Sequence, residues 1–429
     1  MLKIFRMNLM PHSSVRIFSL FFVFFKALTF FVPLLLLNQL SHSDYIIIES
    51  GLAISNIVVI LLNMGVSAAI PLYLLKENKK SDVAYIYFHS ITVSSLMLLV
   101  ALTCHFLLDY PKIVFICIIV SLLCNLRVIA SHKKTLAQPI QASFFESFVF
   151  VVLSMCIIIG LMIGEINLSI INFCLAIAAI YLVTLAVAEA LFSENKLIRF
   201  QFFKLKELYS FSAISLLSGI AIILIITLIR ALGDGFLTNE EYLSYSTYFR
   251  YSSITIIAFQ FILTLKFKDI YESSEDYLDR KSCQIICLIL FLGLCLYYSQ
   301  SSIFPLLFNH DIQLILTNHN HVFFPVILAM PLWAISAILE NIIARERAFK
   351  SMLVYLGILF SSFSIIVLVL LYINKFDFLR MLYFHIILLV ALVSSQLLAL
   401  SKLGIKLIRV RIVVIVHLIL GVLGASLSS

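Results

Sequence analysis

The stretch Val15–Leu37 reads VRIFSLFFVFFKALTFFVPLLLL, and its composition decides the fold class of the chain. Within it only Arg16 and Lys26 carry charge. A helix needs about 20 apolar residues to cross a hydrocarbon core of about 30 Å. The stretch is too long for the apolar region of a signal peptide, and no small-residue cleavage site follows it. It is therefore predicted to be a membrane-spanning helix that is retained in the protein.

Similar apolar stretches recur along the whole chain. The chain is 62% hydrophobic and 12% charged, and its mean hydropathy is +1.11. A soluble domain cannot cover that much apolar surface. The connectors are too short for a soluble catalytic domain, so an enzyme is not expected. We predict an all-α integral membrane protein with about twelve spans, at 15–37, 45–75, 83–107, 113–131, 142–164, 168–192, 208–232, 242–265, 283–305, 322–344, 352–373 and 378–400.

Positive charge gathers on every second connector. Of the 30 Lys and Arg residues, 24 lie on one set of alternate connectors, and the other set holds only Lys112, Lys375 and Arg380. Cytoplasmic loops of membrane proteins carry such an excess. The bias predicts a multi-pass protein of the bacterial inner membrane with both termini in the cytoplasm. The net charge of +8 is explained by this excess, so no nucleic-acid partner is expected.

The tail at 403–429 is ambiguous. It contains Lys406, Arg409 and Arg411 and then a short apolar run. It is either a further span or an amphipathic segment lying in the membrane interface. We favour the interfacial placement, because the apolar run is short and an even number of spans keeps both termini on one side.

A short repeat relates the two halves of the chain. Leu40–Tyr45 (LSHSDY) aligns with Leu237–Tyr242 (LTNEEY) at an offset of 197 residues. Each stretch leads from an outer connector into the second span of its half, so six spans follow between the repeats. Repeats with an even number of spans insert in the same orientation, as in many secondary transporters. We therefore expect two six-helix bundles, 1–200 and 201–402, followed by the tail.

Other motifs are few. The eight cysteines lie within or beside apolar spans and read as small apolar residues. No histidine or cysteine cluster has the spacing of a metal site, and no phosphate loop or nucleophile triad is present. Neither a metal nor an organic cofactor is expected.

Three segments resemble a known family. The first is Asp44-Tyr45, at the entry to the second predicted span, followed by Asn63–Pro71 (NMGVSAAIP). The second is Glu241-Tyr242, an acidic residue and a tyrosine at the entry to the eighth predicted span, and the third is Glu340–Arg345 (ENIIAR). Together with the topology and length of the chain, they are similar to the polysaccharide-exporter branch of the multidrug/oligosaccharidyl-lipid/polysaccharide exporter superfamily, and in particular to O-antigen flippases of the Wzx type. The family usually has glycine after the entry tyrosine, where this chain has Ile46 and Leu243.

The resemblance implies a function. Such a flippase moves undecaprenyl-pyrophosphate-linked O-antigen repeat units from the cytoplasmic to the periplasmic leaflet by alternating access, with proton or sodium coupling by analogy. An O-antigen polymerase and a chain-length regulator would be its partners. Two alternatives stay open: a drug/cation antiporter of the related multidrug branch, and a membrane O-antigen polymerase or glycosyltransferase.

Three cations fall inside predicted spans, where an unpaired charge is costly. Lys26 lies about 15 Å along a helix from Arg16, and Arg250 about 12 Å below the outer face; Arg230 is near the outer end of its span. Each is a candidate for binding an anionic substrate in a central cavity, since Arg in particular matches phosphate. The alternatives are structural pairing or snorkelling: Lys26 with a glutamate on another span, Arg250 with Glu49, and Arg230 with Asp234.

Three further ionisable residues are candidates for ion coupling. Glu49 and His385 lie in the outer half of their spans, and Glu340 lies near the inner end of the tenth span. A carboxylate or an imidazole within the membrane can relay protons. Structural hydrogen bonding is the simpler interpretation for His385, and Glu340 could instead pair with a basic connector.

Overall fold

The computed structural model describes residues 12–76, 83–108, 110–164, 166–192, 216, 219–265, 273–372 and 377–427. Within these ranges the chain forms helices and connectors and no β-strand. Nine of the described helices are long and apolar enough to cross a membrane. Many large apolar side chains on their outer surfaces are exposed, among them Leu20, Phe106 and Met162, as expected for surfaces that face lipid. An all-α, multi-pass membrane protein follows from these observations.

The first group of helices, here called the N-terminal half, covers the chain as far as residue 192. Its elements are α1 (His12–Gln39), α2 (His42–Leu62), η1 (Val66–Ala68), α3 (Ala69–Pro71), η2 (Leu72–Lys76), α4 (Val83–Leu107), α5 (Pro111–Thr135), α6 (Pro139–Ile163) and α7 (Leu168–Phe192). Proline at the first turn of α5 and of α6 suits a helix start, because the missing N–H would lack a helical partner there anyway. The helix α5 packs against α2, α4, α6 and α7 and forms the centre of this half.

The second group, here called the C-terminal half, begins with a helical segment at 219–232. It continues through η4 (Gly233–Gly235), α9 (Asn239–Ser253), α10 (Ile256–Leu265), α12 (Glu275–Leu307), α13 (His310–Asn318), η5 (Asn320–Val322), α14 (Phe323–Glu346), α15 (Phe349–Tyr372), α16 (Phe378–Ser401) and α17 (Ile408–Leu427). The connector expected to join the halves, 193–207, lies outside the described residues. The helix α14 packs against α9, α12 and α16, and most of its residues are buried.

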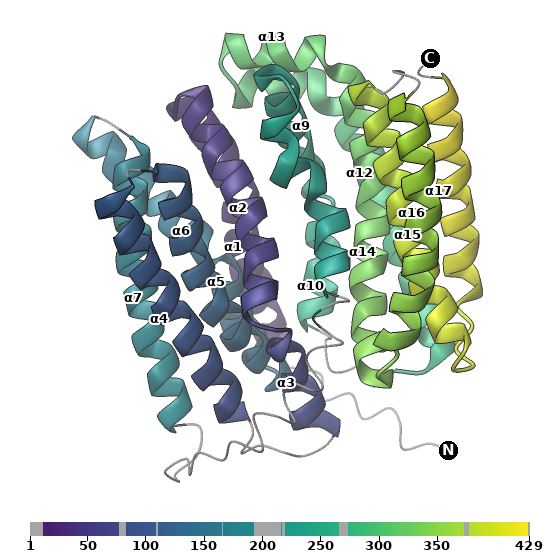
Figure 1. Ribbon diagram of the computed structural model, residues 1–429, viewed down its shortest axis with the longest axis horizontal. Coiled ribbons are helices and arrows are strands. Elements are labelled where there is room, and N and C mark those ends of the chain that lie inside the picture. The colour runs from purple at the N-terminus through teal and green to yellow at the C-terminus, as the bar shows by residue number, and fades with distance from the viewer. Residues whose placement is uncertain are drawn as a thin grey trace.

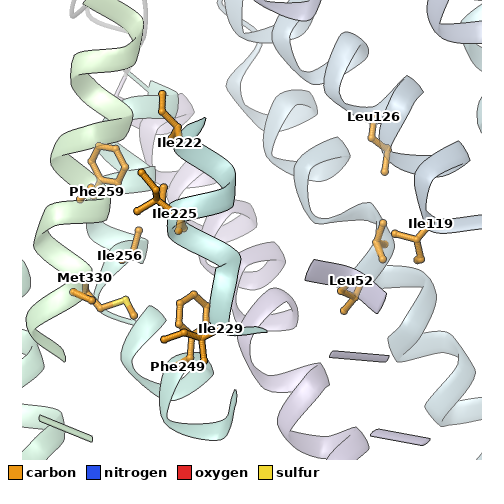
Figure 2. Close-up of a cluster of buried hydrophobic side chains, with 14 of the residues drawn as sticks. Leu52, Ile119, Leu126, Ile222, Ile225, Ile229, Phe249, Ile256, Phe259 and Met330 are labelled. Atoms are coloured by element: carbon orange, nitrogen blue, oxygen red, sulfur yellow. The ribbon is translucent and has the colours of Figure 1, made fainter. Parts of the chain in front are cut away.

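The two halves stand side by side, with α9 and α10 between α1 and the remaining C-terminal helices (Figure 1). The strongest contacts between the halves are made by α1, α2 and α6 on one side and α9 and α10 on the other. Figure 2 shows the apolar packing behind this interface. Ile222, Ile225 and Ile229 follow one face of the segment 219–232 and lie close to Phe259 and Met330.

The predicted span 45–75 is not one helix. After Leu62 the chain turns at Met64 (φ 50°) and Gly65 (φ 67°), and it then resumes as η1, α3 and the π-helical turn η2. Gly65 suits the left-handed conformation because it has no Cβ. Asn63 anchors the turn by donating from Nδ2 to the carbonyl oxygen of Cys124 at 3.2 Å. The NMG segment therefore ends α2 rather than continuing it.

The predicted span 242–265 is also divided. A turn at Ile254 and Thr255 separates α9 from α10. The hydroxyl of Ser253 donates to the carbonyl oxygen four residues earlier, and that of Thr255 to the carbonyl oxygen three residues earlier, a pattern that bends helices. This break leaves α9 and α10 outside the nine candidate spans, and the span expected at 208–232 is only partly described.

The repeated segments adopt the same local structure. Ser41 is the N-cap of α2, and its hydroxyl accepts the N–H of Asp44 at 3.1 Å. Thr238, at the equivalent position, is the N-cap of α9 and forms a full capping box with Glu241. The tyrosines that follow, Tyr45 and Tyr242, are both completely buried. The aligned residues thus begin two helices in the same way.

The tail forms a helix, α17. The helix α17 packs lengthwise along α16 and α12 and returns toward the opposite end of the bundle (Figure 1). The carboxylate of Asp279 on α12 accepts the first N–H groups of α17, from Arg409 and Val410, each at 3.1 Å. The exposed side chains of α17 are mostly apolar, including Ile412, Ile415 and Ile419, whereas an interfacial helix would have a polar face.

The lengthwise packing of α17 sets where the described chain ends lie relative to each other. The start of α1 and the end of α17 lie at opposite ends of the bundle (Figure 1). The apolar run after Arg411 was judged too short, but α17 extends over 20 residues, which is enough to cross a bilayer.

Candidate functional site

A cavity of about 410 Å³ lies between the halves at the end of the bundle where α3 lies. We call it the inner cavity. Its volume falls within the usual range for small-molecule sites. It is lined from α2 to α6 by Asn56, Ser67, Pro71, Leu123, Leu126, Arg127, Ala130, Ser131, Lys134, Phe145 and Glu146, and from α14 and α15 by Glu340, Asn341, Ala344 and Phe349. The cavity is therefore shared by the two halves.

Arg127 is the deepest cation of the inner cavity. It lies eight residues, or about 12 Å, before the end of α5. Its Nη2 donates to Oδ1 of Asn56 on α2 at 2.7 Å. This bond leaves further N–H groups of the guanidinium for other acceptors, because Arg carries five donors. A planar group of this kind matches the oxygens of a phosphate.

Glu146 bridges two lysines at the edge of the inner cavity. Its Oε2 accepts from Nζ of Lys26 on α1 at 3.1 Å, and its Oε1 pairs with Lys134 at the end of α5. We call Lys26, Lys134 and Glu146 the Glu146 cluster. All three residues belong to the N-terminal half. With two cations and one carboxylate, the cluster has a net positive charge beside the cavity.

Glu340 enters the inner cavity from the C-terminal half, near the end of α14. Its carboxylate makes no hydrogen bond or ion pair within the described part of the chain. Arg127 is the cationic residue that interacts with it electrostatically across the cavity. The cavity thus holds an acceptor as well as donors, and the two lie on opposite halves.

A second charged cluster closes the interface toward the other end of the bundle. Glu49 lies about 10 Å along α2 from its start, and it is completely buried. Its Oε1 accepts from Nε of Arg250 at 2.8 Å, and its Oε2 accepts from Nη2 of Arg250 at 3.1 Å and from Nη2 of Arg230 at 2.8 Å. We call these three residues the Glu49 cluster.

Aromatic rings enclose the Glu49 cluster. The guanidinium of Arg230 lies 4.7 Å from the ring centroid of Phe249, and that of Arg250 lies 5.5 Å from the ring of Phe150. Phe249 also stacks on Trp333 of α14, with 5.8 Å between ring centroids. Such contacts stabilise a cation when water is excluded. They do not neutralise it, so the cluster keeps a net charge of about +1.

One donor of the Glu49 cluster is unsatisfied. Within the described residues, Nε of Arg230 is buried and has no hydrogen-bond partner. The backbone at Arg230 is well fixed, because Tyr242 donates from its hydroxyl to the carbonyl oxygen of Arg230 at 2.8 Å. A buried donor without an acceptor is destabilising and calls for an explanation.

Further contacts join the halves at the same end as the Glu49 cluster. Lys112 at the start of α5 pairs with Asp234 in η4. Asn38 near the end of α1 donates from Nδ2 to the carbonyl oxygen of Leu307 at 2.8 Å. At the opposite end the inner cavity lies between the halves. Among the described residues, the polar bridges between the halves are thus concentrated at the end away from the cavity.

The structure brings together three of the six predicted site residues. Arg230, Arg250 and Glu49 form one cluster, while Lys26 is in the Glu146 cluster, Glu340 is in the inner cavity and His385 is separate. His385 contacts the carbonyl oxygen of Ile225 through Nε2 at 2.6 Å. The pairings expected as alternatives for Lys26 and Arg250 are present. The one suggested for Arg230 is not, because Asp234 faces Lys112 instead.

Sequence reasoning missed Arg127 and Lys134 as site residues. Both were counted with the basic connector after the fourth span. The useful signal was spacing: Arg127 precedes Lys133 and Lys134 by six and seven residues, or about 10 Å of helix, so it could not belong to the same connector. Its hydrogen-bond partner Asn56 lies at the same depth on α2.

Comparison of the chain with known protein families, with characterised proteins and with solved structures finds no match.

Proposed function

We propose that this protein is a flippase that moves an anionic lipid-linked oligosaccharide across the bilayer by alternating access. The inner cavity carries the proposal: it lies between two helical halves, and Arg127 and Lys134 line it. A substrate with a pyrophosphate group offers the oxygens that these donors need. Because the cavity ends at the connectors that carry most of the positive charge, it would open to the cytoplasm.

The substrate would be an undecaprenyl-pyrophosphate-linked repeat unit, as the resemblance to O-antigen flippases implies. Arg127 and Lys134 would receive the pyrophosphate from the inner leaflet. Lys26 would support this step through Glu146, and Arg230 and Arg250 would bind the same anion later in the cycle. The lipid tail would stay in the bilayer while the sugars cross. No bond is made or broken, so the residues act by binding and release.

The experiment that tests this function follows the lipid-linked intermediates. Deleting the gene should cause complete single repeat units to accumulate on the cytoplasmic leaflet. Arg127→Ala should reproduce this accumulation at normal protein abundance, and Arg127→Lys should restore part of the export. Single units on the periplasmic side would indicate a polymerase. Unchanged intermediates in the deletion strain would exclude both functions.

A second candidate function is antiport of an organic cation. The observation that favours it is Glu340, a cavity carboxylate without a hydrogen-bond partner among the described residues. A carboxylate in this position is what proton exchange against a cation requires. In everted vesicles, an organic cation would then release protons, and Glu340→Gln would abolish the response. The cationic lining of the same cavity favours the flippase.

The proposed orientation is also testable. The protein would be in the inner membrane with the start of α1 in the cytoplasm and the end of α17 outside. Cysteines at the exposed positions 43 and 240 should then react with an impermeant reagent added outside, while a cysteine at the exposed position 350 should not. Alkaline phosphatase fused after Ser429 should be active, because it is active only in the periplasm. An inactive fusion would show that the tail lies in the membrane interface or in the cytoplasm.

A further inference from the structure

The Glu49 cluster carries more positive charge than its carboxylate neutralises. Two guanidiniums on the C-terminal half share a single carboxylate from the N-terminal half. Glu49 uses both oxygens, yet Nε of Arg230 still has no acceptor among the described residues. A carboxylate has two oxygens, whereas a phosphate or pyrophosphate has more oxygens and more negative charge. The two arginines therefore present a site that fits a larger anion better than it fits Glu49.

Both arginines belong to the C-terminal half, and the guanidinium of Arg250 also lies against the ring of Phe150 on α6 of the N-terminal half. Arg230 is fixed at its backbone by the hydroxyl of Tyr242 and at its guanidinium by the ring of Phe249. Arg250 belongs to α9, the same helix as Phe249. Separation of the halves would remove Glu49 together with α2, while Arg230 keeps its contacts with Tyr242 and Phe249 and Arg250 stays beside it on α9. A site that is already arranged before its ligand arrives loses less entropy on binding.

We infer that Glu49 is an internal substitute for the substrate's anion. In the described conformation it occupies the Arg230–Arg250 site and so holds the halves together at the end away from the inner cavity; we call this contact the latch. A phosphate-bearing lipid that reaches the site replaces the carboxylate and releases the latch, so that the halves separate there. This inference rests on the proposed function, because it assigns the step at which the substrate's anion opens the outer side.

The location of the other contacts supports a latch at this end. The Lys112–Asp234 pair and the Asn38 bond to Leu307 also join the halves there. The pair is partly exposed, at 34% and 18% of the two side chains, so it contributes little. The fully buried Glu49 is therefore the principal polar contact that must break.

A cysteine placed beneath the cluster tests the inference. Ala53 lies one helical turn beyond Glu49 on the same face of α2 and is completely buried. Ala53→Cys would be introduced into the full-length protein with its eight native cysteines replaced, and labelled in cells with an impermeant maleimide from outside. We expect slow labelling with Glu49 present and labelling at least fivefold faster with Glu49→Gln.

Two controls separate a released latch from general loosening. Glu189→Gln removes a carboxylate that pairs with Lys133 at 2.7 Å between helices of one half only, outside the inner cavity, and it should leave the labelling of the Ala53→Cys variant unchanged. If Glu49→Gln fails to fold, the Glu49→Gln/Arg230→Gln double variant serves instead. Its net charge equals that of the native cluster while the ion pairs between the halves are still lost, so fast labelling is expected again.

The anion exchange itself is tested with geranylgeranyl pyrophosphate added to the Ala53→Cys variant that retains Glu49. We expect faster labelling with this lipid and no change with geranylgeraniol, which lacks the anion. Unchanged labelling in both Glu49 variants would overturn the latch, and no response to the pyrophosphate lipid would overturn the substitution by an anion. Failure of the proposed function would show differently, as normal distribution of lipid-linked units in the deletion strain.

Discussion

The Glu49 cluster and the Glu146 cluster are built from the same parts and placed differently. Each has one carboxylate between two cations. In the first, the carboxylate comes from one half and both cations from the other, and no part of Glu49 is exposed. In the second, all three residues belong to one half, and 24% of the Glu146 side chain is exposed. The difference is the basis for the two proposed roles: the first cluster joins the halves, and the second lies at the edge of the cavity proposed to bind the substrate.

The cations also differ between the clusters. Arginine engages a carboxylate with two parallel bonds and keeps its charge when buried, whereas lysine is a flexible point charge. The fully buried cluster uses arginine, and the cluster at the cavity edge uses lysine. A lysine can exchange its partner for a substrate oxygen without losing a fixed geometry. We therefore expect substitutions in the Glu49 cluster to affect stability and conformation first, and those in the Glu146 cluster to affect transport first.

The largest expected effect is that of Glu49→Gln. It leaves two buried guanidiniums without a counter-charge, and breaking a buried ion pair on one side typically costs about 3–5 kcal/mol. Glu146→Gln should cost about half as much, because water reaches that cluster. Unfolding of the purified protein in mixed micelles with increasing dodecyl sulfate, followed by circular dichroism, measures both. Equal losses would remove the distinction between the clusters.

The next effect is that of Lys26→Ala. The variant removes one of the two cations on Glu146, and a hydrogen bond to a charged group contributes about 1.5–3 kcal/mol. Export should fall strongly while protein abundance stays normal, and Lys26→Arg should retain part of it. The assay is the yield of exported saccharide relative to membrane protein. Full export by Lys26→Ala would show that this cluster has no part in transport.

A smaller effect is expected of Arg250→Lys. The lysine keeps the charge but replaces two bonds to Glu49 by one, so we expect a loss of about 1.5 kcal/mol, at the low end for bonds to charged groups. The same conservative exchange in the other direction, Lys26→Arg, should change the unfolding free energy much less. Comparing the two exchanges by the same unfolding titration shows whether the bidentate geometry matters at Glu49.

The smallest effect is that of Lys112→Ala. Its pair with Asp234 is partly exposed at the rim of the interface between the halves, and such pairs contribute less than about 1 kcal/mol. Raising the salt concentration should reduce even this difference, because salt screens exposed charges. If Lys112→Ala lowered the free energy of unfolding as much as Glu49→Gln, the Lys112–Asp234 pair, and not Glu49, would be the principal contact between the halves.

The sequence predicted the membrane class and the local start of both repeats, because these depend on apolar length and on capping chemistry that a short stretch contains. Ser41 and Thr238 show this directly, since both cap their helices as aligned. It did not determine the partners of Lys26, Arg230 and Arg250, because each pair joins residues more than 100 positions apart. Such pairs depend on how the helices pack, and packing is not periodic in the sequence.

The errors have local causes. The break at Met64 and Gly65 lies inside an apolar run, where hydropathy does not distinguish a left-handed turn from a helix. The charged residues Arg409 and Arg411 lie at the beginning of α17, where the carboxylate of Asp279 accepts two backbone N–H groups, and the rest of the helix is apolar. Arg127 was overlooked because counting charges by connector ignores depth. In each case a residue's position along its helix mattered more than its type.

The stack of Trp333 on Phe249 has a further consequence. Trp333 is the single tryptophan of the chain, and its aromatic neighbour lies against the guanidinium of Arg230. Indole emission depends on nearby charge and water. The protein thus contains its own optical probe beside the point where its halves meet. Changes in the fluorescence of unlabelled protein would give the rate at which that meeting point opens.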